Sequence, residues 1–211
     1  MSRWKPAVRK ATLLLPLALL VLGAFPAAGQ EVIRVMICTG QCFGVDDKGA
    51  RVPLARGAEL PSGQSLATGP NSYAQIALGR ETAFAVGENT RVRFDRRDAS
   101  RDVVILDEGR IRVVGGEAIG RTATRPLELR TSEGNLVLRS VDIEVKNLPQ
   151  VGNAGQATTL VKLNLGDARL GDMPITKESV QGIVGGRLLD RAIPVRDIAL
   201  VARKDVPPAK T

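Results

Sequence analysis

The sequence of 211 residues contains no histidine. Histidine is the base in Ser-His-Asp and Cys-His catalysis, a common zinc ligand, and the side chain whose ordinary pKa lies near neutrality. Its absence excludes these catalytic groups and every zinc site that needs an imidazole. No other pattern of residues points to an active site, so we predict a protein without enzymatic activity, cofactor or metal.

Aromatic side chains are scarce, at 3% of the residues, and the single tryptophan, Trp4, lies close to the N-terminus. Beyond residue 29 the aromatic side chains are Phe43, Tyr73, Phe84 and Phe94. Proteins that bind single-stranded nucleic acid stack the bases on aromatic side chains. We therefore expect no nucleic-acid partner.

The first 29 residues have the three parts of a secretory signal peptide. A basic segment, MSRWKPAVRK, precedes an apolar run from Ala11 to Ala28, and the small residues Ala27 and Gly29 suit a signal peptidase. We predict cleavage after Gly29; cleavage after Ala28, or retention as a membrane anchor, is the alternative. Two prolines and a glycine in the run disfavour a spanning helix.

Export has two consequences for the rest of the chain. We expect a periplasmic or secreted protein of Gram-negative type, without a membrane span after cleavage because no later apolar run is long enough. The net charge falls from +8 to +4, because four basic residues and no acidic residue leave with the signal peptide.

The only cysteines are Cys38 and Cys42. Residues four apart in an extended strand lie about 13 Å from one another, whereas a disulfide needs Cα atoms within about 7 Å. The bond therefore requires a tight turn, which Gly40 permits. In an oxidising compartment we predict an intramolecular disulfide. Free thiols, a redox switch or an intermolecular bridge remain the alternatives, and two thiolates are too few for a structural zinc site.

Apolar and polar residues alternate with a period of two, which is typical of strands with one buried face. Clusters rich in Gly, Asp and Asn separate these runs and predict turns, including one at residues 107–109. No amphipathic helix lies between them, so the pattern predicts an all-β fold. The expected strands are residues 32–37, 73–78, 91–94, 110–114, 127–131, 141–146, 161–165 and 198–202.

The organisation that we predict is a signal peptide (residues 1–29), one domain (residues 30–205) and a flexible tail (residues 206–211). Residues 152–159, GNAGQATT, are expected to form a surface loop. Residues 176–189 are the one place where a short helical turn is expected, although three glycines oppose a long helix.

Several motifs follow one another along residues 54–145. A leucine and glycine ladder, LARGAELPSGQSLATG, occupies residues 54–69, and NSYAQIALG follows at residues 71–79. LDEGRIRV (106–113), TSEGNLVLR (131–139) and VDIEV (141–145) come next. The motifs and their order resemble the FecR domain family. The family usually has an Arg-Gly-Thr step before the closing strand, where this chain has Arg139-Ser140-Val141.

The resemblance covers a core motif region at residues 40–149, with completing strands expected at residues 159–202. It implies a β-solenoid or flattened β-roll of about ten or more short strands with little helix, or alternatively an antiparallel β-sandwich. It also implies a domain that works by binding protein. The cytosolic anti-sigma region and the membrane helix of the signalling members have no counterpart here, so we expect a free-standing module.

Arginines at alternate strand positions are the main candidates for an interaction face. Arg91 and Arg93 project from one face of their strand, as do Arg110 and Arg112. If the two strands are neighbours, the four guanidinium groups gather and can hold an anionic polymer, a lipid headgroup or an acidic protein. The alternative is a charged rim that prevents edge-to-edge aggregation.

The paired carboxylates have structural explanations. Asp46-Asp47 and Asp107-Glu108 adjoin glycines and are expected in solvated turns. Asp142 and Glu144 share a strand face with Lys146, and we expect this face to be exposed to water.

Two functional hypotheses follow. The first is an exported, non-enzymatic FecR-like domain for protein binding, signalling or scaffolding in the cell envelope, with an unidentified protein partner. The second is a binder of anionic envelope glycan or lipid through the arginine face. A structural component of a surface layer is a third possibility.

Overall fold

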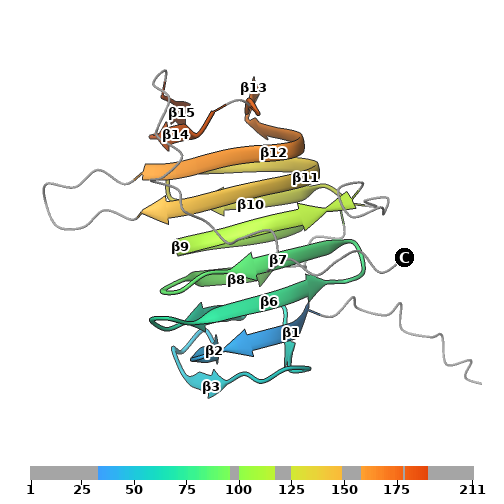
Figure 1. Ribbon diagram of the computed structural model, residues 1–211, viewed down its shortest axis with the longest axis vertical. Helices are drawn as coiled ribbons and strands as arrows, with labels where there is room; N and C mark the ends of the chain where they lie inside the picture. The colour runs from blue at the N-terminus through green and yellow to red at the C-terminus, as the bar shows by residue number, and fades with distance from the viewer. Residues whose placement is uncertain (1–32, 96–99, 117–124, 149–157, 178, 190–211) are drawn as a thin grey trace, which may run out of the picture. The chain divides into compact units, whose positions relative to one another are not determined.

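Fifteen strands joined in one mixed sheet make up the computed structural model of the chain (Figure 1). The chain divides into two compact units, Met1–Gln30 and Glu31–Thr211. The structure describes residues 33–95, 100–116, 125–148, 158–177 and 179–189, all of which belong to the second unit. None of these residues forms a helix with the length and apolar character needed to cross a membrane. The all-β prediction is confirmed.

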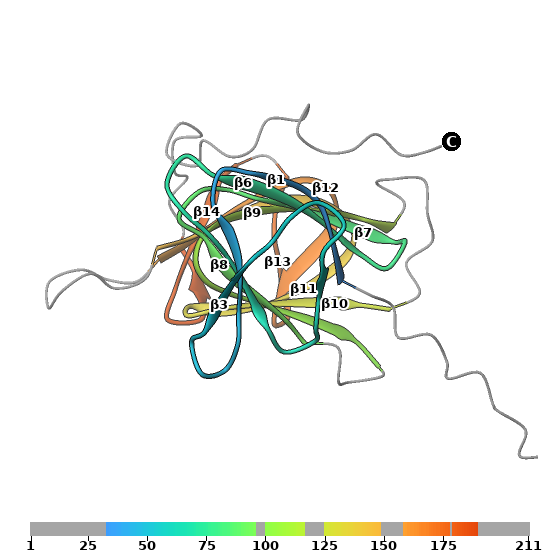
Figure 2. The same cartoon turned by 90° about the horizontal axis from the view of Figure 1, so that it is seen from below.

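The sheet folds back on itself into two layers, which Figure 2 shows stacked on one another. We call them layer A and layer B. The strands of layer A, in order, are β3 (Arg51–Pro53), β2 (Cys42–Val45), β5 (Ser65–Thr68), β8 (Arg91–Asp95), the first half of β9 (Asp102–Gly115), β10 (Leu127–Thr131), the start of β11 (Gly134–Leu148), the end of β12 (Thr158–Leu170) and β13 (Met173–Pro174).

Layer B contains the other halves of the three long strands. Its strands, in order, are β4 (Glu59–Leu60), β1 (Ile33–Thr39), β6 (Tyr73–Leu78), β7 (Thr82–Val86), the second half of β9, the end of β11, the start of β12, β14 (Gln181–Val184) and β15 (Arg187–Leu188). Neighbouring strands are antiparallel, apart from β9 and β10. A solenoid of parallel coils is therefore not formed, and the arrangement is a flattened roll.

The hydrophobic core lies between the two layers. Alternate residues of each strand point inward, and they form one continuous buried cluster. Phe84 of layer B and Phe94 of layer A meet edge to face, with ring centroids 5.2 Å apart and planes at 80°. Burying a side chain of this size contributes about 1.5–3 kcal/mol, so this contact is a major link between the layers.

The bend of β9 differs from the sequence prediction. Residues 107–109 were predicted to form a turn between two strands, but β9 runs through them without interruption. Gly109 has a φ of +90°, and a Cβ at this position would come within 2.5 Å of the Cα of Thr90. Only glycine satisfies both conditions. The glycine thus marks a bend that carries one strand from layer A into layer B.

A second bend lies in β11, where the pairing with β12 shifts between Arg139 and Asp142. Ser140 has a φ of +48° there. This left-handed conformation is the one that glycine adopts most readily. A serine thus stands where the backbone favours glycine.

Other predictions fall into two groups. The helical turn expected within residues 176–189 is wrong, because residues 181–184 and 187–188 form the hairpin of β14 and β15. The signal peptide, the loop at 152–159, the strand at 198–202 and the tail at 206–211 lie outside the described residues, apart from the loop's last two positions, which begin β12.

The conformation of Ser140 gives a prediction about stability. Replacing Ser140 by glycine should raise the free energy of unfolding by about 0.5–1 kcal/mol, because relief of the left-handed penalty exceeds the entropic cost of glycine. Urea denaturation measures the change. Ala55→Gly, at an exposed turn position without a positive φ, is the control and should lower stability. Equal loss in both variants would contradict the argument.

Candidate functional site

The four arginines of the predicted interaction face do not come together. Arg91 and Arg93 lie on β8 and point outward from layer A, opposite residues 105–108 of β9. Arg110 and Arg112 lie beyond the bend of β9, in layer B, where they pair with β11. The strands are neighbours, as the hypothesis required, but the bend at Gly109 places the two arginine pairs on different layers.

Arg112 is only 3% exposed, so the prediction that it belongs to an exposed interaction face is wrong. Its Nε and Nη2 atoms donate to the two carboxylate oxygens of Asp142, each at 2.7 Å. This double hydrogen bond raises the pKa of Arg112. Asn164 donates to both Asp142 and Glu144. Asp142 is buried as well, so the expectation of a water-exposed row was wrong at this position.

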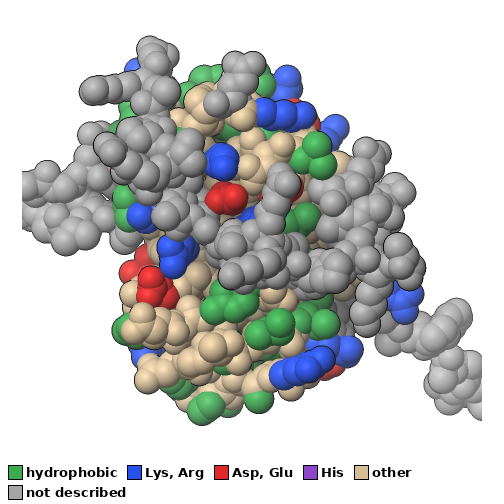
Figure 3. Space-filling view, viewed as in Figure 1, with side chains coloured by type: hydrophobic (Ala, Val, Ile, Leu, Met, Phe, Trp, Pro, Cys, Tyr) green, Lys and Arg blue, Asp and Glu red, His purple; other side chains and the backbone are tan. Residues whose placement is uncertain are grey.

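The remaining predicted arginines differ in their partners. Arg110 lies 3.2 Å from Glu88, and Arg91 lies 3.7 Å from Asp107. No described carboxylate comes within ion-pair distance of Arg93. Figure 3 shows acidic and basic side chains interspersed on one face of the molecule. Arg91 and Arg110 are thus paired with nearby carboxylates, whereas Arg93 is not.

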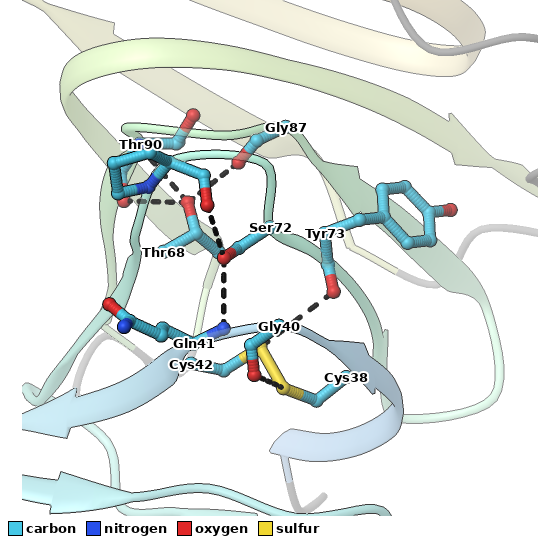
Figure 4. The surroundings of a disulfide bond; sticks show 10 residues. Cys38, Gly40, Gln41, Cys42, Thr68, Ser72, Tyr73, Gly87 and Thr90 are labelled. Atoms are coloured by element: carbon cyan, nitrogen blue, oxygen red, sulfur yellow. Dashed lines mark hydrogen bonds between the residues drawn. A yellow bond between two sulfur atoms is a disulfide. The ribbon is translucent and has the colours of Figure 1, made fainter.

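Cys38 and Cys42 form a disulfide, as the sequence predicted. The bond closes the corner at which the chain passes from β1 in layer B to β2 in layer A, and the two Cα atoms are 6.2 Å apart (Figure 4). Gly40 has a φ of +76°, and a Cβ there would come within 2.5 Å of Ser72 Oγ. The same hydroxyl accepts a hydrogen bond from the Gln41 backbone amide at 2.8 Å.

The neighbouring corner, from β7 to β8, is held by two threonines (Figure 4). The Thr68 hydroxyl donates to the Gly87 carbonyl at 2.6 Å and accepts from the Thr90 amide at 3.0 Å. The Thr90 hydroxyl in turn accepts from the Arg110 amide at 3.0 Å. Three corners of the roll are thus tied to one another by hydrogen bonds and by the disulfide.

A groove of about 370 Å³ lies on the outward side of layer A, beside these corners. Ala67 and Gly69 contribute to its lining, together with Phe43, Arg91 and Glu108. The Arg51 guanidinium, also in the lining, lies 5.9 Å from the centre of the Phe43 ring. We call this feature the layer A groove.

A second hollow, of about 280 Å³, lies further along the same side of layer A. Its lining includes Arg101, Glu128 and Val137. Glu128 accepts hydrogen bonds from Arg130 at 2.8 Å and from Arg101 at 3.0 Å. The bond from Arg130 is the main reason that the pKa of Glu128 is lowered. We call this feature the Glu128 pocket.

Apart from Arg91, sequence reasoning missed the residues that line these two hollows. Alternation along residues 127–131 places Glu128 and Arg130 on one face, but it gives no sign that Arg101 reaches the same carboxylate. Phe43 and Arg51 belong to different strands joined by a hairpin, and their contact depends on the register of β2 and β3.

Searches of protein-family models and of curated proteins find no match to this chain. Within the described ranges, no three Cys, Asp or Glu side chains are arranged to hold a metal ion.

Reduction of the disulfide should lower the free energy of unfolding by about 2 kcal/mol, the chain-entropy value for so short a loop. Urea denaturation with and without a thiol-free reductant measures this difference. The Cys38→Ala/Cys42→Ala variant is the control, and reductant should not affect it. Mass spectrometry of the purified native protein should detect no free thiol; two free thiols would overturn the disulfide.

The lowered pKa of Glu128 predicts how stability depends on pH. Because the folded-state pKa lies below the ordinary value of 4.5, the unfolded chain takes up a proton first as the pH falls. The contribution of Glu128 is present at neutral pH and is lost as the pH falls below about 4.5 and through the folded-state value. Glu128→Gln should remove this part of the acid-induced loss, measured as unfolding free energy against pH. Identical profiles would contradict the assignment.

Proposed function

We propose that the chain is an exported, non-catalytic module of FecR type that binds a protein partner in the cell envelope. The signal-peptide pattern of residues 1–29 supports export, and the ordered motifs of residues 54–145 support the FecR resemblance. The all-β roll and the disulfide at its corner are consistent with a rigid binding domain outside the cytoplasm.

The observation that carries the proposal is the layer A groove. It combines the half-buried Phe43, the exposed Arg51 stacked near its ring, and the Arg91 side chain. Aromatic residues and arginines are enriched in protein interfaces and supply much of their binding energy. The groove lies on strands that the corner bonds and the disulfide hold, so its walls are fixed before a partner arrives.

A binder of anionic glycan or lipid is the second candidate. Arg51 and Arg93 favour it, because they lie in one row across β3, β2, β5 and β8 and no described carboxylate pairs with either. Against it, a polyanion must compete with the carboxylates that already neutralise Arg91, Arg110 and Arg112. A protein surface with both signs of charge complements this pattern better.

The test is photo-crosslinking in living cells. A photoreactive amino acid replaces Gln41, an exposed residue in the lining of the groove. We expect a discrete adduct with one protein, and Arg51→Glu should reduce its yield at least about tenfold, because the arginine contact becomes a repulsion. Arg187→Glu, the same charge reversal on β15, is the matched control and should leave the yield unchanged.

Other outcomes distinguish the two candidates. Absence of a protein adduct, together with retention on anionic lipid vesicles that moderate salt abolishes, would overturn protein binding and favour the glycan or lipid candidate. An adduct that is insensitive to Arg51→Glu would show that the layer A groove is not the interface.

A further inference from the structure

Glu128 is buried at a position where the strand pattern places an outward side chain. Its neighbours Leu127 and Leu129 point into the core, whereas Glu128 lies opposite Val103 of β9 and Val137 of β11. It is nevertheless only 8% exposed. A buried carboxylate is costly unless it is paired. Because Glu128 is buried, its carboxylate must be paired with positively charged side chains.

The partners are two arginines, each bound to a different oxygen. Arg130 donates from Nε to Oε1, and Arg101 donates from Nη1 to Oε2. The arginine side chains remain 43% and 48% exposed, while that of Glu128 is 11% exposed. One buried carboxylate thus holds two guanidinium groups of half-exposed side chains. The Nη atoms of Arg130 donate to no described residue.

An apolar wall lies next to these arginines. Pro126, Leu127 and Val137 line the Glu128 pocket, and Val137 is 37% exposed, which makes it one of the large apolar side chains that reach the surface. Arg169 of β12 lies opposite Val137, and no described carboxylate pairs with it. Arg101 and Glu128 line this partly apolar hollow, and Arg130 and Arg169 lie beside its lining residues.

We propose that the Glu128 pocket binds an acidic residue and an adjacent large aliphatic residue of the partner protein. This inference rests on the proposed function and names the chemistry that the partner presents. The carboxylate of the partner lies against Arg130 and Arg101, whose planar guanidinium groups match carboxylate geometry. The aliphatic side chain lies in the hollow against Val137.

The size of the pocket favours a peptide over a lipid. Its volume of about 280 Å³ lies just below the range of about 300–1,000 Å³ that is typical of pockets enclosing whole small molecules. A side chain with its neighbour fits such a space, whereas a long acyl chain needs a deeper one. Glu128 fixes the arginines in advance, which reduces the ordering cost of binding.

The test uses the full mature chain, labelled for NMR, and three short Gly-Ser peptides that contain Leu-Asp, Leu-Asn or Ser-Asp. The Leu-Asp peptide should shift the methyl signals of Val137 and the amide signals of Leu127 and Glu128. Its affinity should exceed that of each of the other two peptides by about tenfold, through the charged hydrogen bonds in one case and the apolar contact in the other.

The Glu128→Gln variant distinguishes an effect of arginine orientation from an effect of the net charge of the pocket. Glu128→Gln makes the pocket more positive, so charge alone predicts tighter binding of the Leu-Asp peptide. If Glu128 acts by orienting Arg101 and Arg130, the same variant binds the peptide more weakly, by several-fold. Arg130→Lys keeps the charge and loses the planar group, and it provides the same test if Glu128→Gln fails to fold. Arg187→Gln is the control.

Several outcomes would overturn the inference: no shift at Val137 with millimolar Leu-Asp peptide, equal affinity for Leu-Asn, or tighter binding by Glu128→Gln. A larger shift with octanoate than with the peptide would assign the pocket to a lipid-like ligand instead. These results leave the proposed function standing if the Gln41 adduct persists and remains sensitive to Arg51→Glu. Loss of that adduct with peptide binding intact would overturn the proposed function alone.

Discussion

The crossing of strands between two layers is the constraint on which this structure depends. A strand can change layers only through a sharp bend, and the bends here use left-handed backbone at Gly40, Gly109, Ser140 and Gly166. At Gly109 and Gly166 a Cβ would overlap a neighbouring segment. The bends therefore fit against each other, and the side chains of Thr68, Ser72 and Thr90 bond across three of the corners. Figure 4 shows Thr68, Ser72 and Thr90 in the surroundings of the disulfide.

The same bends decide which side chains can act together. Because β9 changes layers at Gly109, its first half presents side chains outside layer A and its second half presents them outside layer B. Arg112 consequently joins Asp142 in a buried pair, while Arg91 borders the layer A groove. The Glu128 pocket lies on layer A as well, so the two hollows that carry our proposals share one side of the roll.

Alternation along the sequence predicted the local structure well. It matched β6 and β10 in full, because a strand with one buried face leaves a period of two. It failed at residues 107–109, because glycine marks a bend within a strand as readily as a turn between strands. The outward direction of Arg112 was correct, but its burial depends on Asp142, 30 residues away. The Arg101 contact with Glu128 has the same origin, since pairing of distant strands leaves no local pattern.

The ends of the sheet have a consequence for assembly. As far as the described strands go, the roll ends in β3, β4, β13 and β15, each only two or three residues long. So short an edge offers few free backbone groups on which another chain could continue the sheet. Polymerisation by strand addition is therefore disfavoured, even though the sheet is open. A higher-order array of this protein would have to form through contacts between side-chain surfaces, and would be built of discrete rolls and not of a shared sheet.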